Sequence, residues 1–302
     1  MHRAKETGRN RYVCYTEELN ARAQESLEYE MGLRKALQNR EFVLYYQPRV
    51  NIATGVLNGA EALLRWQHPT QGLVLPEQFI ALLEDTGLII PAGEWVLQQA
   101  CRQCRQWHDA GHSHLRISVN LSMRQFRSGS LIASVQRALA DSGLPPHCLE
   151  LELTESVLVE DTEQALDLMR ELKKIGVYLS IDDFGTGYSS LNYLRHFPID
   201  LLKIDGSFIR DVNRSQSDAA ITTAIAAMAK SLGLGILAEG VETREQVRFL
   251  RTIGCHEMQG FLFSKPVPGE RFLAVMGGLD VLKLAGLGPV PGIAGTGRSA
   301  TI

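Results

Sequence analysis

Short apolar runs alternate along this chain with longer stretches in which apolar residues recur every three or four positions. The short runs predict strands, and the longer stretches predict helices. Eight strands are expected, at residues 43–47, 57–66, 115–121, 149–154, 178–182, 201–204, 235–239 and 260–263. Helices are expected at 76–83, 93–109, 128–141, 162–174, 189–195, 217–232, 244–253 and 269–276. Eight strands that mostly alternate with helices over about 250 residues favour a closed barrel over an open sheet.

The first two predicted strands depart from this alternation. The link between them, at residues 51–55, carries a turn signal at Thr54-Gly55 and is too short for a crossover helix. Parallel strands need a connection of about a dozen residues or more, so these two strands are expected to pair antiparallel. The predicted fold class is α/β, a modified TIM (β/α)8 barrel with an antiparallel first strand.

The composition changes at both ends of this predicted barrel. Residues 16–35 are polar and predict a helical connector, which leaves 36–280 for the barrel. Residues 281–302 end in a segment rich in glycine and proline, and we expect a flexible tail there. The start of the chain lacks the apolar core of a signal peptide, and no apolar run is long enough to cross a membrane.

Charge and cysteine content narrow the possible partners and compartment. The net charge of -3 lacks the basic character expected of a protein that binds duplex nucleic acid. Five cysteines, an odd and sparse set, argue against a disulfide framework and favour a reducing compartment. We therefore expect a cytoplasmic domain without membrane contact from this segment.

Polar residues lie within the predicted strands or at their ends, and in a barrel the inward side chains near the carboxyl ends meet at one mouth. They are Glu61, Asn120, Glu152, Asp182, Asp183, Lys203, Glu239 and, just before the last strand, Gln259. The carboxylates would repel one another unless cations compensate, and Lys203 alone is too little. Oxygen ligands without a histidine or cysteine cluster select Mg²⁺ or Mn²⁺. The pair Asp182-Asp183 can serve two ions, an arrangement that suits hydrolysis of a phosphodiester.

These residues lie in a series of motifs that resembles the EAL family of cyclic di-GMP phosphodiesterases over about residues 36–276. Glu61-Ala62-Leu63-Leu64-Arg65 resembles the E-A-L-x-R signature of that family. The other matching segments are Tyr46-Gln47-Pro48, Ser118-Val119-Asn120, Glu152-Leu153-Thr154-Glu155, the run from Asp182 to Ser190, Lys203-Ile204-Asp205, Ala238-Glu239-Gly240-Val241-Glu242 and Gln259-Gly260-Phe261. The resemblance implies hydrolysis of cyclic di-GMP to linear pGpG in bacterial second-messenger signalling.

The resemblance also implies roles for single residues. Glu61, Asn120, Glu152 and Asp182 would bind one Mg²⁺ or Mn²⁺, and Asp183 the second, with Asp182 shared and Glu239 nearby. Lys203 and Glu239 are the two candidates for the base that activates water, and this choice stays open. Gln47 and Arg65 would hold the substrate, Arg65 through a phosphate, while Gln259 contacts the water and the metal shell. Ca²⁺ is expected to bind without supporting hydrolysis.

A loop and a dimer follow from the same resemblance. Residues 184–190, with Gly185, Gly187 and Ser189, would link the metal site to a homodimer interface, and Glu155 would hold this loop in place. Residues 1–15 resemble the end of a GGDEF-like domain. We therefore expect an upstream GGDEF-like or sensor domain, in a full-length protein that could be tethered to a membrane.

Two other functions remain open at this stage. The first is a catalytically silent receptor that binds cyclic di-GMP or a protein partner. The second is a nuclease-like barrel that acts on other phosphodiesters, because only the resemblance identifies the guanines. The presence of every metal ligand, the lysine and the loop glutamate favours the enzyme.

Overall fold

A computed structural model describes residues 29–155, 162–186 and 194–287 of the chain. Its strands form one sheet in the order β10-β1-β9-β8-β7-β6-β5-β4-β2-β3, and β1 also pairs with β2, which closes the barrel. The strands are β1 (Phe42–Asn51), β2 (Val56–His68), β3 (Gly72–Val74), β4 (Arg116–Leu121), β5 (Leu149–Thr154), β6 (Tyr178–Phe184), β7 (Leu201–Ile204), β8 (Gly235–Ala238), β9 (Glu257–Met258) and β10 (Val267–Pro268). The short strands β3 and β10 extend the barrel at its antiparallel side.

The direction of β1 agrees with the prediction. It pairs antiparallel with both β2 and β9, whereas the neighbouring pairs from β2–β4 round to β8–β9 are parallel. At the turn between β1 and β2 the Asn51 carboxamide accepts hydrogen bonds from the backbone amides of Ala53 and Thr54. Gly55 follows with a φ of 73°, a conformation that glycine adopts without strain.

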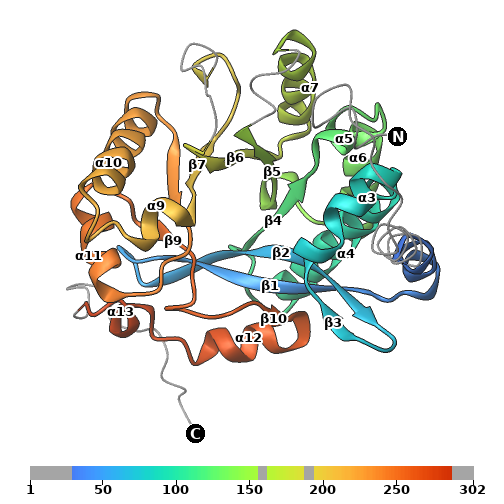
Figure 1. The fold of residues 1–302 in the computed structure, drawn as a ribbon, viewed down its shortest axis with the longest axis horizontal. Helices are drawn as coiled ribbons and strands as arrows, with labels where there is room; N and C mark the ends of the chain where they lie inside the picture. The colour runs from blue at the N-terminus through green and yellow to red at the C-terminus, as the bar shows by residue number, and fades with distance from the viewer. Residues whose placement is uncertain (1–28, 156–161, 187–193, 288–302) are drawn as a thin grey trace, which may run out of the picture.

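Helices surround the strands, as Figure 1 shows. They are η1 (Pro76–Gln78), α3 (Ile80–Thr86), α4 (Ile89–Asp109), α5 (Met123–Phe126), α6 (Leu131–Ser142), η2 (Pro146–Cys148), α7 (Thr162–Ile175), α9 (Gly206–Arg210), α10 (Gln216–Ser231), α11 (Arg244–Thr252), α12 (Gly269–Gly277) and α13 (Val281–Leu284). Their apolar faces pack on the outside of the barrel. Tyr46 of β1, for example, meets Trp107 of α4 and Phe272 of α12, with ring centroids 5.0 and 6.4 Å away. None of the described helices is long and apolar enough to span a membrane.

The last predicted strand is wrong in position. The chain pairs at β9 and then turns, with the Phe263 amide donating to the Gly260 carbonyl, so residues 260–263 form no strand. A β-carbon on Gly260 would lie 2.1 Å from the Val241 carbonyl oxygen. The Val241 amide donates to the Gln259 carbonyl, and the Leu262 amide donates to the Val241 carbonyl. These backbone hydrogen bonds take the place of strand pairing at residues 260–263.

The predicted boundaries at the two ends also need adjustment. Residues 281–284 form α13, and Val281 is buried, so this part of the predicted flexible tail belongs to the folded domain. Residues 29–39 form one continuous helix across the predicted boundary between connector and barrel. The predicted GGDEF-like remnant at 1–15 and the rest of the tail from 288 lie outside the described residues.

The helix at 29–39 packs on the barrel through a second, smaller apolar core. Leu33 and Ala36 are fully buried in this core, with Trp66 at its centre. The Tyr29 ring meets Trp66 edge to face at 5.7 Å, and the Trp66 indole N–H donates to Glu41 at 3.1 Å. The last turns of the connector are therefore part of the barrel's own packing.

We expect Trp66→Ala to lower the free energy of unfolding by about 3–5 kcal/mol, because it leaves a cavity in this core. Urea unfolding followed by circular dichroism measures the loss. Leu73→Ala on the adjacent strand is the control, since Leu73 is 39% exposed and a surface change costs less than about 0.5 kcal/mol. Equal stability of the two variants would contradict the role given to Trp66.

Candidate active site

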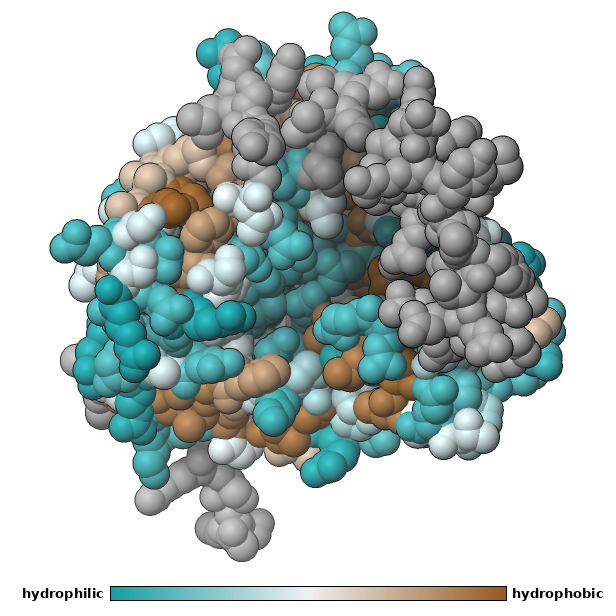
Figure 2. All heavy atoms as spheres, viewed as in Figure 1, coloured by the Kyte–Doolittle hydropathy of each residue, from teal (hydrophilic) through white to brown (hydrophobic). Residues whose placement is uncertain are grey.

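The barrel strands deliver polar side chains to one mouth. Residues two apart on a strand face the same way, and the carboxyl ends of the parallel strands meet at the same end of the barrel. The predicted residues take the following places: Gln47 on β1, Glu61 and Arg65 on β2, Asn120 on β4, Glu152 on β5, Asp182 and Asp183 on β6, Lys203 on β7, Glu239 after β8 and Gln259 after β9. Figure 2 shows hydrophilic residues around a hollow near the centre of one face of the molecule.

The ammonium group of Lys203 is the centre of the site. It lies 2.5 Å from Glu152, 2.7 Å from Glu239, 3.0 Å from Asp182 and 3.8 Å from Glu61, and the lysine is fully buried. Burial disfavours a charged amine, but the four carboxylates outweigh burial and raise the pKa of Lys203 well above its ordinary value. Lys203 is therefore a cation in this arrangement.

Glu239 is the carboxyl group best placed to titrate near neutral pH. Burial, followed by the charges of Asp182 and Glu61, raises its pKa to about 8, against the opposing effect of Lys203. Its side chain is still 16% exposed, so solvent reaches it. A group with such a pKa can accept and release a proton under ordinary conditions.

Two amide side chains orient the carboxylates. The Gln259 amide donates to Glu61 and to Glu239, both at 2.7 Å, and the Asn120 amide donates to Glu61 at 2.6 Å. Glu61 is thus held from two sides. Gln259 thus contacts the acidic cluster directly. It was predicted to precede a strand at residues 260–263, which form no strand in the structure.

The carboxylates form two groups suited to metal ions. Glu61, Glu152 and Asp182 offer oxygens within 4.8 Å of one another, and so do Asp182, Asp183 and Glu239. Asp182 belongs to both groups. The buried Oε1 of Glu152 accepts no hydrogen bond from the described residues. An unsatisfied buried carboxylate oxygen among hard oxygen donors fits a divalent cation such as Mg²⁺ or Mn²⁺.

The backbone at Asp183 explains how two successive aspartates reach the same site. Asp183 has a φ of 53°, a left-handed conformation that is uncommon for residues other than glycine. The pairing of β6 with β7 is irregular between Ile181 and Phe184, which places the distortion at this residue. Burial, and then the charge of Asp182, raises the pKa of Asp183 to about 6. Strain of this kind is characteristic of functional sites.

The structure also ties Glu155 to the loop after β6. Glu155 is buried, and its Oε2 accepts a hydrogen bond from the Gly185 amide at 2.8 Å. Gly185 has a φ of 102°, and a β-carbon there would lie 2.9 Å from the Phe208 ring. Gly187 and Ser189, the other predicted loop residues, lie outside the described residues.

The predicted substrate residues lie in two places. Gln47 lines a cavity of about 230 Å³ together with Glu61, Asp182, Glu239, Gln259 and the exposed ring of Phe261. Arg65 lies farther along β2, beside the Tyr45 ring, and donates to the Leu64 carbonyl. Arg65 is 8% exposed, and no hydrogen bond or ion pair among the described residues joins it to the acidic cluster.

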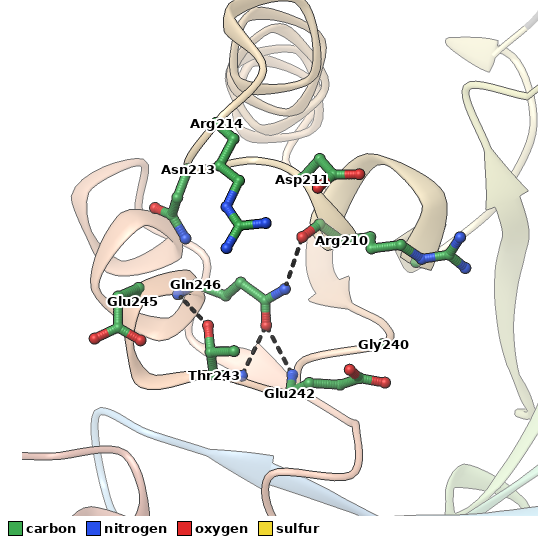
Figure 3. Close-up of a pocket in the computed structure, with 10 residues that line it drawn as sticks. Arg210, Asp211, Asn213, Arg214, Gly240, Glu242, Thr243, Glu245 and Gln246 are labelled. Atoms are coloured by element: carbon green, nitrogen blue, oxygen red, sulfur yellow. Dashed lines mark hydrogen bonds between the residues drawn. The ribbon is translucent and has the colours of Figure 1, made fainter.

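A larger cavity of about 380 Å³ lies beside the acidic one and shares Gly240 and Glu242 with it. Figure 3 shows that the Gln246 carboxamide crosses from α11 to the Arg210 carbonyl and also accepts from the amides of Glu242 and Thr243. None of the five residues of the two carboxylate groups lines it, so the chemistry belongs to the smaller cavity.

Two charged residues below the site were not among those predicted from the sequence. Arg49 and Glu150 are 4% and 1% exposed and pair at 2.8 Å. Both could have been found, because Arg49 lies two residues after Gln47 and Glu150 two residues before Glu152, which puts each on the inward face of its strand. Burial alone would raise the pKa of Glu150, but Arg49 outweighs it and lowers the pKa.

Fold and site together define a modified (β/α)8 barrel whose acidic mouth has the donor atoms for divalent cations. The chain belongs to the EAL domain family, whose model matches residues 31–266. The predicted family is confirmed, and so is the predicted barrel fold.

The chain is also similar to individual relatives and to a solved structure of the same family. The chain is 49% identical over 274 residues to the bifunctional diguanylate cyclase/cyclic di-GMP phosphodiesterase MucR of Pseudomonas aeruginosa, a match that covers 91% of this chain and 40% of MucR. It is 47% identical over 268 residues to the cyclic di-GMP phosphodiesterase NbdA of the same organism, covering 89% of this chain and 34% of NbdA. A structure of the MucR phosphodiesterase in complex with c-di-GMP superposes with a TM-score of 0.79 at 49% identity, over 81% of this chain and 99% of that one. The chain thus spans two fifths or less of the length of these two curated relatives.

The raised pKa of Glu239 predicts how the metal-free protein responds to pH. Between the ordinary pKa of 4.5 and the folded value of about 8, the folded state holds a proton that the unfolded state has lost. Stability should therefore fall as pH rises from 5 to 8, by roughly 1 kcal/mol per pH unit where this group dominates. Urea unfolding in EDTA at several pH values measures the slope.

Glu239→Gln is the matched variant, because it cannot lose a proton and should flatten this slope. Saturating Mg²⁺ should offset the fall most strongly at pH 8, where the carboxylate is free to bind it. Metal-free wild-type protein that gains stability from pH 5 to 8 would contradict the assignment.

Proposed function

We propose that this domain hydrolyses cyclic di-GMP to linear pGpG with Mg²⁺ or Mn²⁺. The observation that carries the proposal is the pair of carboxylate groups that share Asp182 around the buried cation of Lys203. Membership of the EAL domain family supports it, as do relatives named cyclic di-GMP phosphodiesterases and a homologous structure in complex with c-di-GMP. All residues of the predicted metal site lie at one mouth.

The charges of the site support two ions. Five carboxylates form the two groups at the mouth, and Glu150 and Glu257 lie below them beside Arg49; the five are Glu61, Glu152, Asp182, Asp183 and Glu239. The cations Arg49 and Lys203 balance two of these charges. When ionised, the carboxylates outnumber these two cations, and two divalent ions would offset most of the excess negative charge.

The chain offers ligands for both ions. One would be held by Glu61, Asn120, Glu152 and Asp182, and the other by Asp182, Asp183 and Glu239. When bound, such ions polarise the phosphodiester and lower the pKa of an attacking water. Ca²⁺, with its longer and looser coordination, is expected to occupy the site without supporting turnover.

Between the two candidates for the general base, the geometry favours Glu239. Lys203 remains protonated among its carboxylates and therefore holds them in place as a cation. Glu239 is partly exposed and is oriented by Gln259, so its carboxylate is placed to take the proton of the attacking water. Gln47 and Arg65 would hold the dinucleotide, with the Arg65 fork on a phosphate.

Assembly and context are further parts of the proposal. The loop after β6, held by Glu155, would transmit a homodimer contact to Asp182 and Asp183. The curated relatives are much longer than the region that this chain matches, and one of them is named a bifunctional diguanylate cyclase/phosphodiesterase. We propose that a GGDEF-like or sensor domain precedes this domain in the full-length protein. We propose that this domain acts in the cytoplasm, on a small nucleotide and not on duplex nucleic acid.

Incubation of the purified chain with cyclic di-GMP and Mg²⁺ or Mn²⁺ should give pGpG, followed by chromatography. EDTA, Ca²⁺ in place of Mg²⁺, and Glu61→Ala should each abolish the product, because each removes a competent metal site. Retained cyclic di-GMP binding without any product would instead indicate the silent receptor. Product from unrelated cyclic or linear dinucleotides at the same rate would indicate a general nuclease.

Glu155→Ala should lower kcat about 10- to 100-fold, the usual effect of losing a group that orients ligands from outside. Glu155→Gln keeps an oxygen acceptor for the Gly185 amide and should retain more activity than the alanine variant. Thermal unfolding should show both variants folded at the assay temperature. A folded alanine variant with wild-type kcat would remove Glu155 from the proposal.

A further inference from the structure

A buried arginine lies beneath the acidic cluster. Arg49 is 4% exposed, and its Nη1 lies 2.8 Å from Glu150 Oε2 and 3.9 Å from Glu152 Oε1. Its Nη2 lies 3.6 Å from Glu257, a residue of β9 that is 22% exposed. The Arg49 guanidinium therefore faces carboxylates from two strands: β9, which pairs with β1, and β5, which is not a neighbour of β1 in the sheet.

The reversed direction of β1 puts Arg49 at this depth. Because β1 runs opposite to its neighbours, residues later in its sequence lie deeper below the mouth. Gln47 lines the acidic cavity, and Arg49, two residues later on the same face, lies one layer below it. Glu150 and Glu152 occupy the same two layers on β5.

Arg49 and Lys203 act on different oxygens of Glu152. Lys203 contacts Oε2 at 2.5 Å, while Oε1 faces Arg49 at a distance longer than a hydrogen bond. Oε1 is attracted by the guanidinium yet keeps its lone pairs, and it accepts no hydrogen bond from the described residues. The carboxylate is thus held in orientation with one oxygen left for another ligand.

We propose that Arg49 is a positioning residue for metal binding. Its guanidinium, held by Glu150, is a fixed positive charge beneath Glu152 and leaves Glu152 Oε1 to bind a divalent ion. The inference rests on the metal site of the proposed function. An arginine suits this place because its planar fork reaches Glu150 and Glu257 with different nitrogens. A lysine ammonium is a single point charge and would serve one of them.

The test is Mn²⁺ binding to the metal-free protein, measured by isothermal titration calorimetry without nucleotide. Arg49→Met combined with Glu150→Gln removes one charge of each sign, so that no buried charge loses its partner in this pair. We expect the Mn²⁺ dissociation constant to rise at least about 10-fold, as for the loss of other groups that orient ligands. Arg49→Lys should give a smaller rise, because it restores the charge but not the fork.

The control is a second ion pair far from the mouth. Lys173 and Asp200 pair at 2.7 Å, and Asp200 also accepts from the Leu179 amide at the start of β6. Lys173→Met combined with Asp200→Asn should lower stability and leave the Mn²⁺ dissociation constant unchanged. An equal rise in this control would show that the effect comes from general loss of packing, and would overturn the inference.

Two further outcomes decide the matter. Wild-type Mn²⁺ affinity in the folded Arg49/Glu150 double variant would overturn the proposal. Should that variant not fold, wild-type affinity in Arg49→Lys would overturn it in the same way. Because no nucleotide is present, a chain that binds Mn²⁺ but does not hydrolyse cyclic di-GMP would leave this inference standing while the proposed function failed.

Discussion

The structure depends on one buried cation. The Lys203 ammonium contacts carboxylates from β2, β5, β6 and the end of β8, so a single side chain joins strands across the whole barrel. Desolvated carboxylates at these distances would otherwise repel one another and take up protons. Replacing such a cation by an apolar side chain would leave several buried charges unpaired, which is far more costly than losing a surface ion pair. The positive charge of Lys203 therefore allows several carboxylates to lie close together at the mouth.

The reversed first strand is the second constraint, and it gives this barrel an unusual interior. A regular barrel fills its interior with layers of branched apolar side chains. Here the layer below the mouth contains Arg49 and Glu150, both buried and charged. Since β1 runs antiparallel to its neighbours, Gln47 supplies a neutral polar group at the mouth, and Arg49, two residues later, supplies a cation in the layer below it. The same strand therefore contributes both to the substrate cavity and to the support beneath it.

Sequence reasoning succeeded where a residue's place follows from its strand. Glu61, Glu152 and Lys203 were located because each interrupts the apolar run of its strand, and a closed barrel brings the inward side chains of its strands together. It failed where tertiary contacts decide the local structure. Residues 260–263 are apolar enough for a strand, but the Gly260 backbone packs against Val241 instead. The Val281 side chain is buried by contacts that no local pattern reveals.

The left-handed backbone of Asp183 was beyond local prediction for a related reason. Propensity favours an extended conformation for a residue in β6, yet the site requires two adjacent side chains on one side. The surrounding fold must therefore impose the conformation, and the tie from Glu155 to Gly185, two residues later, is a contact able to do so. Arg49 was not predicted because the expected first strand ends at residue 47, whereas β1 continues to Asn51 and the two-residue spacing from Gln47 turns Arg49 into the barrel.

The charge count of the mouth also bears on the order in which ligands would bind. Above the raised pKa values of Glu152 and Glu239, the metal-free site carries an excess of negative charge even when the cations Arg49 and Lys203 are counted. A cyclic dinucleotide has two phosphodiester groups and is itself an anion, so it would be repelled by the empty mouth. Two divalent ions offset most of that excess and turn repulsion into attraction at the phosphate. Under the proposed function, metal binding thus precedes productive substrate binding, and the groups that shape the metal site, Arg49 among them, also govern affinity for the nucleotide.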